Sequence, residues 1–158
     1  MSCPAENVLR RGFCIPNNAW GVRVLAKIAL VAFGGAIGSL ARWGVGLAVA
    51  GWLERFPRTA FPWGTFIINV TGCLFLGWFT TLLNERLALA GAGWLTSENL
   101  RLMIAVGFTG AYTTFSTFEY EANDSFSKGD GLVATLYIIS SVVLGLLAVR
   151  LGVILARR

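Results

Sequence analysis

The sequence predicts an all-α integral membrane protein whose chain crosses the bilayer four times. Of its 158 residues, 56% are hydrophobic and only 13% are charged, whereas soluble domains carry about 25% charged residues. Apolar stretches of about 20 residues, the length that spans a bilayer, recur along the chain and leave room for four helices. We expect one four-helix transmembrane domain over residues 22–158, with spans at about 22–52, 63–83, 99–121 and 132–155.

Residues 1–21 form a polar N-terminal extension that we expect to be mobile. It contains no apolar run long enough for a signal peptide. Its Cys3 and Cys14 could pair, although nothing in the sequence requires a disulfide. The chain has no histidine and no CxxC pair, which argues against a zinc site and against an enzyme. The net charge of +5 comes from arginines that flank the spans, so it suits anionic lipid headgroups better than nucleic acid.

The first span combines a small face with a charge. Gly34 and Gly38 form a GxxxG pattern, which favours close contact with a neighbouring helix. Arg42 lies further along, where a charge costs several kcal/mol unless it reaches water or a partner. Arg42 either extends to the interface or places a positive charge in an aqueous vestibule, and the two interpretations are compatible.

The second and fourth spans each carry a polar face. Thr65 and Asn69 are four residues apart in the second span, as are Tyr137 and Ser141 in the fourth, so each pair shares one side of its helix. An asparagine within a membrane needs a partner, which is more often another helix than a passing ion. Helix packing alone would explain the Tyr137 and Ser141 pair.

The third span is the least helix-like, because two glycines, Gly107 and Gly110, precede five hydroxyl side chains in the six positions 112–117. Glycine and β-branched threonine weaken a helix, so we interpret residues 107–114 as a break. Irregular backbone is tolerated at membrane depth only where it is buried in protein or lines an aqueous cavity. Phe115 and Phe118 are three residues apart and share a face. The alternative is a Gly/Thr-rich helix packed tightly on a neighbour.

Acidic residues are expected outside the bilayer. Glu119, Glu121 and Asp124 follow Phe118, which predicts that the third helix enters water there. The interior then offers hydroxyls, one amide, aromatic edges and one arginine. These groups suit an anion, and they lack the membrane carboxylate that a proton-coupled exporter needs.

Three motifs together resemble the CrcB/Fluc family of fluoride channels. They are Gly34-Gly-Ala-Ile-Gly-Ser-Leu-Ala-Arg42, Trp63-Gly-Thr-Phe-Ile-Ile-Asn69, and the 107–118 stretch that ends in Thr-Thr-Phe-Ser-Thr-Phe. The resemblance covers about residues 28–155, with the motifs in the family's order and spacing.

The resemblance implies a passive, fluoride-selective channel in the cell inner (plasma) membrane, which exports cytoplasmic fluoride and lowers its toxicity. It implies an antiparallel, dual-topology homodimer in membrane lipid, with two fluoride pores and a structural Na⁺ at its centre. Motif matching assigns the Na⁺ to the backbone carbonyls of Gly110 and Thr113. It assigns the anion pathway to Arg42, Thr65, Asn69, Phe115, Ser116, Thr117, Phe118, Tyr137 and Ser141. Gly145 departs from the pattern, because some relatives carry a second serine there.

Two questions stay open at this point. More Lys and Arg flank the N-terminal side of the spans than the opposite side, and such a bias favours one orientation. We favour the homodimer over a heterodimer with an oppositely oriented relative. The alternative functions are a coupled small-molecule or cation exporter and a non-transporting membrane assembly factor.

Overall fold

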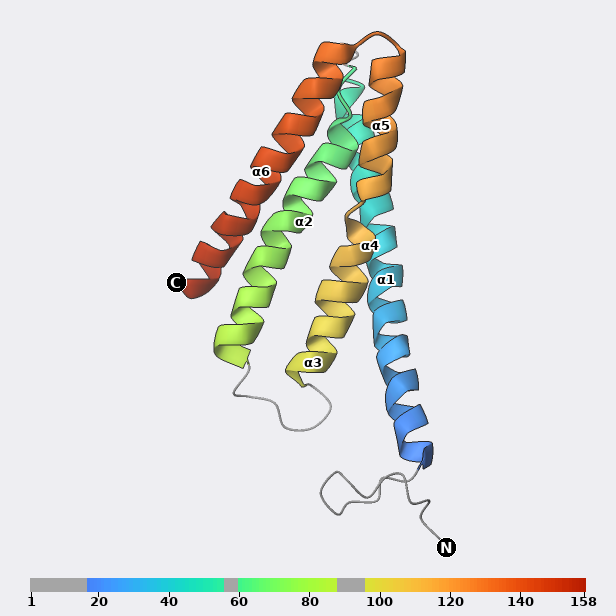
Figure 1. Ribbon diagram of the computed structural model, residues 1–158, viewed down its shortest axis with the longest axis vertical. Helices are drawn as coiled ribbons and strands as arrows, with labels where there is room; N and C mark the ends of the chain where they lie inside the picture. The colour runs from blue at the N-terminus through green and yellow to red at the C-terminus, as the bar shows by residue number, and fades with distance from the viewer. Residues whose placement is uncertain (1–16, 56–59, 88–95) are drawn as a thin grey trace, which may run out of the picture.

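The computed structural model describes residues 17–55, 60–87 and 96–158, and these are almost entirely helical (Figure 1). The all-α prediction is therefore confirmed. The long helices are α1 (Asn17–Leu53), α2 (Trp63–Leu82) and α6 (Gly131–Arg157). Between α2 and α6 lie shorter segments: the π-type turn η2 (Leu83–Leu87), α3 (Ser97–Leu100), the π-type helix η3 (Arg101–Thr109), α4 (Gly110–Tyr112) and α5 (Phe115–Ser127).

Helix α1 begins earlier than the sequence predicted. Residues 17–21 belong to α1, although we had placed them in the N-terminal extension. Residues 1–16, with Cys3 and Cys14, lie outside the described part of the chain. The expected mobility of the extension and its possible disulfide therefore stay predictions.

Within the described residues, three helices are long and apolar enough to cross a membrane. They cover Gly21–Leu53, Trp63–Glu85 and Gly131–Arg157, and they correspond to the first, second and fourth predicted spans. The residues of the third predicted span belong to the shorter segments α3 to α5. The described chain is thus an integral membrane fold with three continuous apolar helices.

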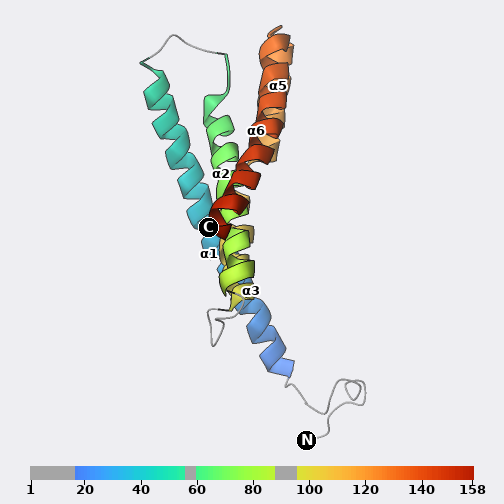
Figure 2. The ribbon, with the colours of Figure 1, turned by 90° about the vertical axis from the view of Figure 1, so that its left-hand side faces the viewer.

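Helices α2 and α6 lie side by side, and glycines bring their backbones into contact (Figures 1 and 2). A methyl group at Gly152 would lie 2.3 Å from the carbonyl oxygen of Leu74, and one at Gly77 would lie 2.4 Å from that of Val149. Neither approach leaves room for a side chain. This pairing fixes the framework on which α5 packs against α6.

Helix α1 crosses η3 through the predicted GxxxG face. A methyl group at Gly38 would lie 2.2 Å from the carbonyl oxygen of Phe108, and Gly107 meets the carbonyl oxygen of Val31 in the same way. The close contact expected of Gly34 and Gly38 is therefore confirmed. Gly107 also serves this contact rather than a break.

Replacing Gly34 by alanine is expected to destabilise the fold, because its new methyl group would lie 1.9 Å from the carbonyl oxygen of Met103. Overpacking against backbone costs about 1–3 kcal/mol or more. Thermal unfolding in detergent should show a clearly lower Tm for Gly34→Ala. Gly44→Ala is the matched control, since nothing lies within 4 Å of that position. Equal melting of the two variants would contradict the packing.

Candidate functional site

The helical path is interrupted at Thr113 and Thr114, between α4 and α5. Helix α4 ends at Tyr112, and the backbone is extended at Thr113 (φ −80°, ψ 159°) and Thr114 (φ −149°, ψ 115°). The Thr114 hydroxyl then accepts a hydrogen bond from the amide of Thr117 and caps α5. The interruption is narrower than residues 107–114, because residues 107–112 remain helical where they pack on α1.

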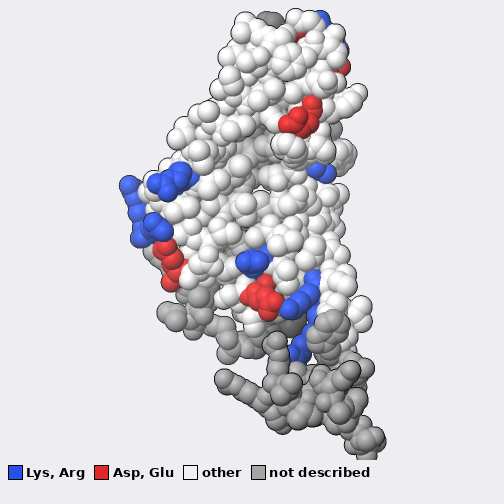
Figure 3. Space-filling model, viewed as in Figure 1, with Lys and Arg blue, Asp and Glu red and all other residues white. Residues whose placement is uncertain are grey.

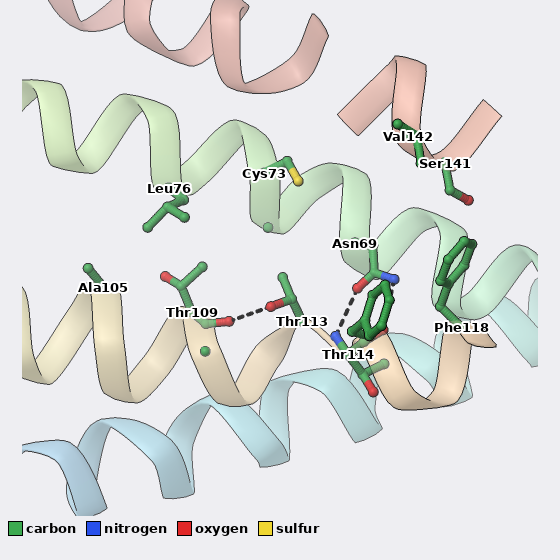
Figure 4. Close-up of a pocket in the computed structure, with 13 residues that line it drawn as sticks. Asn69, Cys73, Leu76, Ala105, Thr109, Thr113, Thr114, Phe118, Ser141 and Val142 are labelled. Atoms are coloured by element: carbon green, nitrogen blue, oxygen red, sulfur yellow. Dashed lines mark hydrogen bonds between the residues drawn. The ribbon is translucent and has the colours of Figure 1, made fainter. Parts of the chain in front are cut away.

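Asn69 holds the interrupted backbone from the neighbouring helix α2 (Figure 4). Its side-chain Nδ2 donates to the carbonyl oxygen of Thr114 at 3.1 Å, and the amide of Thr114 donates to Asn69 Oδ1 at 2.9 Å. One side chain therefore satisfies both backbone groups of a residue that no helix serves. Of the two interpretations offered for Asn69, the hydrogen bond between helices is the one observed.

Gly72 makes room for this arrangement. A methyl group there would lie 2.3 Å from Cγ2 of Thr113. The hydroxyl of Thr113 donates back to the carbonyl oxygen of Thr109 at 3.0 Å. The Thr113 side chain therefore packs flat against α2, and its position is set by a glycine on one side and a helix turn on the other.

The interruption diverts two amides from their usual acceptors. In an α-helix the amide of each residue bonds the carbonyl four residues earlier, so Thr114 would serve Gly110 and Thr117 would serve Thr113. Here the Thr114 amide donates to Asn69, and the Thr117 amide donates to the Thr114 hydroxyl. The carbonyls of Gly110 and Thr113 thereby lose their helical donors.

An open pocket of about 330 Å³ lies beside the interruption, between α2, α5 and α6. It brings together six of the residues that the sequence singled out: Asn69, Gly110, Thr113, Phe115, Phe118 and Ser141 (Figure 4). The Ser141 oxygen is buried and has no hydrogen-bond partner among the described residues. A hydroxyl donor is thus available to a ligand in an otherwise largely apolar pocket.

The two phenylalanines of the pocket have different surroundings. Their ring centroids are 5.9 Å apart. Phe118 is 7% exposed and its ring lies 5.0 Å from that of Tyr137, whereas Phe115 is 74% exposed. The pocket wall that contains Phe115 is therefore open to whatever lies beside this chain.

Thr65 and Tyr137 meet at a residue that the sequence interpretation missed. The Thr65 hydroxyl donates to Oε1 of Glu121, and the Tyr137 hydroxyl donates to Oε2, each at 2.9 Å. Glu121 is half-buried between the helices and is not a freely solvated side chain. Glu121 follows Phe118 by three residues and so shares its helix face, which packs against α6. That spacing was the available signal.

Glu121 also weakens one inference from the sequence. The sequence argued against a coupled exporter because no carboxylate was expected among the helices. Glu121 is such a carboxylate and is partly buried, so that argument no longer holds. Its two oxygens are both occupied by hydroxyl donors. In this arrangement Glu121 orients Thr65 and Tyr137 rather than presenting a free acceptor.

Glu121→Gln is expected to lower stability by about 1–2 kcal/mol, because the amide keeps one acceptor oxygen and its nitrogen cannot accept the hydrogen bond of the second hydroxyl. Thermal unfolding in detergent measures the change. Glu119→Gln is the control, since Glu119 is exposed on the same helix. If both variants melt at the same temperature, Glu121 does not hold the two hydroxyls as described.

The remaining predicted residues lie around these groups. Ser116 and Thr117 are exposed on α5, and the Thr117 hydroxyl accepts from that of Thr114 at 2.9 Å. Arg42 is half-buried on α1, outside the pocket lining. A methyl group added at Gly145 would lie 3.5 Å from the sulfur of Cys73. The Cys73 thiol therefore lies next to the position at which some relatives carry a serine.

Comparison with known proteins gives a consistent result. A family model described as "CrcB-like protein, Camphor Resistance (CrcB)" matches residues 29–153. A protein of Acidobacterium capsulatum named "Fluoride-specific ion channel FluC" is 47% identical over 132 residues, covering 84% of this chain and 97% of the relative. A protein of the same name from Chloroflexus aurantiacus is 48% identical over 131 residues, covering 83% and 95%. "Fluoride-specific ion channel FluC 2" of Clostridium acetobutylicum is 42% identical over 123 residues, covering 78% and 92%.

Proposed function

Because this chain belongs to the CrcB-like protein family, we propose that it is a passive fluoride-specific ion channel. The observation that carries this proposal is the 47% identity to a fluoride-specific channel over 97% of that channel's length. It is a multi-pass protein of the inner membrane, and not an enzyme. Weak acid enters a cell as HF and dissociates inside, and a passive channel then lets the trapped fluoride leave.

The pocket has the chemistry that fluoride requires. Fluoride is small and strongly hydrated, so a pathway must replace water hydrogen bonds at close range. The Ser141 hydroxyl lacks a partner among the described residues. A carboxamide has two N–H donors, so Asn69 retains one after bonding Thr114. The positive edges of Phe115 and Phe118 can also face an anion.

The third membrane crossing is proposed to run through the interruption, over about residues 99–121. Its halves run in succession alongside the other helices (Figure 1). The interrupted backbone is held by Asn69 and borders the pocket. This is the setting in which non-helical backbone is tolerated at membrane depth.

The residues fit a structural Na⁺. The carbonyls of Gly110 and Thr113 have lost their helical donors, and both residues line the pocket. Carbonyl oxygens suit a hard cation. Each subunit would supply two of them, so a second subunit completes a set of four. The ion would offset repulsion between the carbonyls.

A second subunit in the opposite orientation would also close the pathway. Phe115 is 74% exposed and the pocket beside it is open. We favour an antiparallel homodimer with two pores, and an oppositely oriented relative is the other possible partner. Activity of a C-terminal reporter fusion on one side of the membrane only would exclude the homodimer.

Removing Na⁺ is expected to destabilise the dimer, because an ion that binds only the folded state stabilises it by mass action. At 100 times the Kd this amounts to about 2.7 kcal/mol. The Tm measured in a Na⁺ salt should therefore be higher than the Tm measured in the salt of an organic cation at equal ionic strength. An identical Tm in both salts, with the dimer intact, would contradict a structural role for the cation.

The function can be tested in cells. A bacterium that lacks its own fluoride exporter should grow in millimolar fluoride when it expresses this chain, and should fail with an empty vector. Growth in chloride or bromide should not change. If the membrane-inserted protein gave no protection, the proposed export would be contradicted.

A further inference from the structure

Basic side chains gather where α1 meets α3, away from the pocket. Arg23 and Lys27 are one helical turn apart on α1. Nζ of Lys27 contacts Oε1 of Glu98 at 2.6 Å. Lys27, and to a smaller extent Arg101, hold the pKa of Glu98 below its usual range, which places Arg101 near the same carboxylate. Lys27 and Arg101 therefore lie near one carboxylate, and Arg23 lies one helical turn before Lys27, so three cations and one anion give this region an excess of positive charge.

An apolar groove begins at this cluster. It is open, has a volume of about 540 Å³, and lies between α1 and the α3–η3 segment. Its polar end is formed by Lys27 and Glu98. Its remaining lining is hydrocarbon: Ile28, Val31, Ala32 and Leu102. Figure 3 shows Lys and Arg side chains grouped around acidic ones in the lower half of the molecule.

We propose that this groove binds an anionic phospholipid, with the headgroup phosphate at Arg23, Lys27 and Arg101 and an acyl chain along the apolar lining. The ligand must be amphipathic, because the groove is cationic at one end and apolar at the other. It must be anionic, since the cluster carries an excess of positive charge. The apolar span of α1 begins at Gly21, and the groove lies near this N-terminal end. This position places the groove at the depth of the lipid headgroups.

The ion pair between Lys27 and Glu98 leaves other positive charges near the groove uncompensated. Lys27 and Glu98 are 44% and 65% exposed, so both can reorganise around a phosphate. Arg23 and Arg101 are exposed, and they supply the bidentate donors that phosphate oxygens prefer. A phosphate at this point would bring the cluster closer to neutrality.

The test is lipid retention by the full-length protein. The protein is reconstituted in phosphatidylcholine vesicles that contain phosphatidylglycerol, extracted in mild detergent, and analysed by native mass spectrometry for bound lipid. The wild type should retain phosphatidylglycerol well above its share of the bilayer. Arg23→Gln/Arg101→Gln should weaken this preference by up to about thirtyfold, at about fivefold for each charge removed.

The matched control is Arg150→Gln/Arg158→Gln. It removes two exposed charges near the C-terminal end of the chain, beside the ion pair of Arg157 with Glu85. This variant should keep the preference for phosphatidylglycerol. An equal loss in both double variants would show diffuse attraction to the membrane and overturn the proposal.

Two further outcomes would also overturn it. One is a wild type that retains the two lipids in their bulk ratio. The other is a shift of Arg23→Gln/Arg101→Gln from dimer to monomer on size exclusion, which would make the groove a subunit contact. Fluoride efflux by the variants shows that they are folded, and its absence from all proteins would concern the channel proposal alone.

Discussion

Asn69→Asp is expected to reduce fluoride flux by at least a hundredfold. Aspartate can still accept from the Thr114 amide, but it cannot donate to the Thr114 carbonyl, so two oxygens face each other where Nδ2 now bonds at 3.1 Å. The new charge also lies in the pocket that the anion is proposed to cross. Two like charges 4 Å apart repel by about 4 kcal/mol at a dielectric constant of 20. Each 1.36 kcal/mol in a barrier is tenfold in rate.

The measurement is fluoride efflux from liposomes that contain equal amounts of each protein. Asn84→Asp is the control, because Asn84 is exposed on η2 and the substitution is chemically the same. It should conduct like the wild type. Near-normal flux through Asn69→Asp would mean that fluoride conduction depends neither on the hydrogen bonds between Asn69 and Thr114 nor on the charge of the pocket.

Phe118→Ile is expected to lower flux by tenfold or more while the dimer stays intact. Isoleucine keeps an apolar side chain but removes the ring edge, and with it the contact between Phe118 and Tyr137 at 5.0 Å. Phe118 is 7% exposed, so its edge is held in one position. Phe115→Ile should also lower flux, and the more exposed Phe115 would be held in position by the second subunit of the proposed dimer.

Phe126→Ile is the control for both rings. It lies further along the same helix and is 50% exposed, outside the pocket lining. Its flux should match the wild type, and size exclusion should give the same dimer for all three variants. Full flux in both Phe115→Ile and Phe118→Ile would remove the aromatic rings from the pathway.

The sequence predicted the features that depend on local pattern. Long apolar runs marked the three continuous spans, and the Gly34–Gly38 spacing marked the close crossing of α1 and η3. Both signals depend only on residue type and helical period, which tertiary packing does not alter.

The features that depend on pairing across helices could not be predicted in this way. Glu121 has the charged neighbours of a surface residue, and although its spacing from Phe118 places it on the packed face, its partners Thr65 and Tyr137 come from two other helices. The glycines likewise led to a predicted break, residues 107–114, that is longer than the interruption in the structure. Gly107 provides a close approach to α1, whereas the interruption falls on Thr113 and Thr114, whose backbone is held from α2 by Asn69.

Fluoride conduction is tested most directly by efflux from liposomes that contain the purified protein in Na⁺, followed with a fluoride electrode and, in parallel, a chloride electrode. We expect rapid fluoride release with no chloride release above that of empty liposomes. Absence of fluoride release from well-folded dimers would contradict a fluoride channel and would leave the interruption at Thr113 and Thr114 as a feature of helix packing.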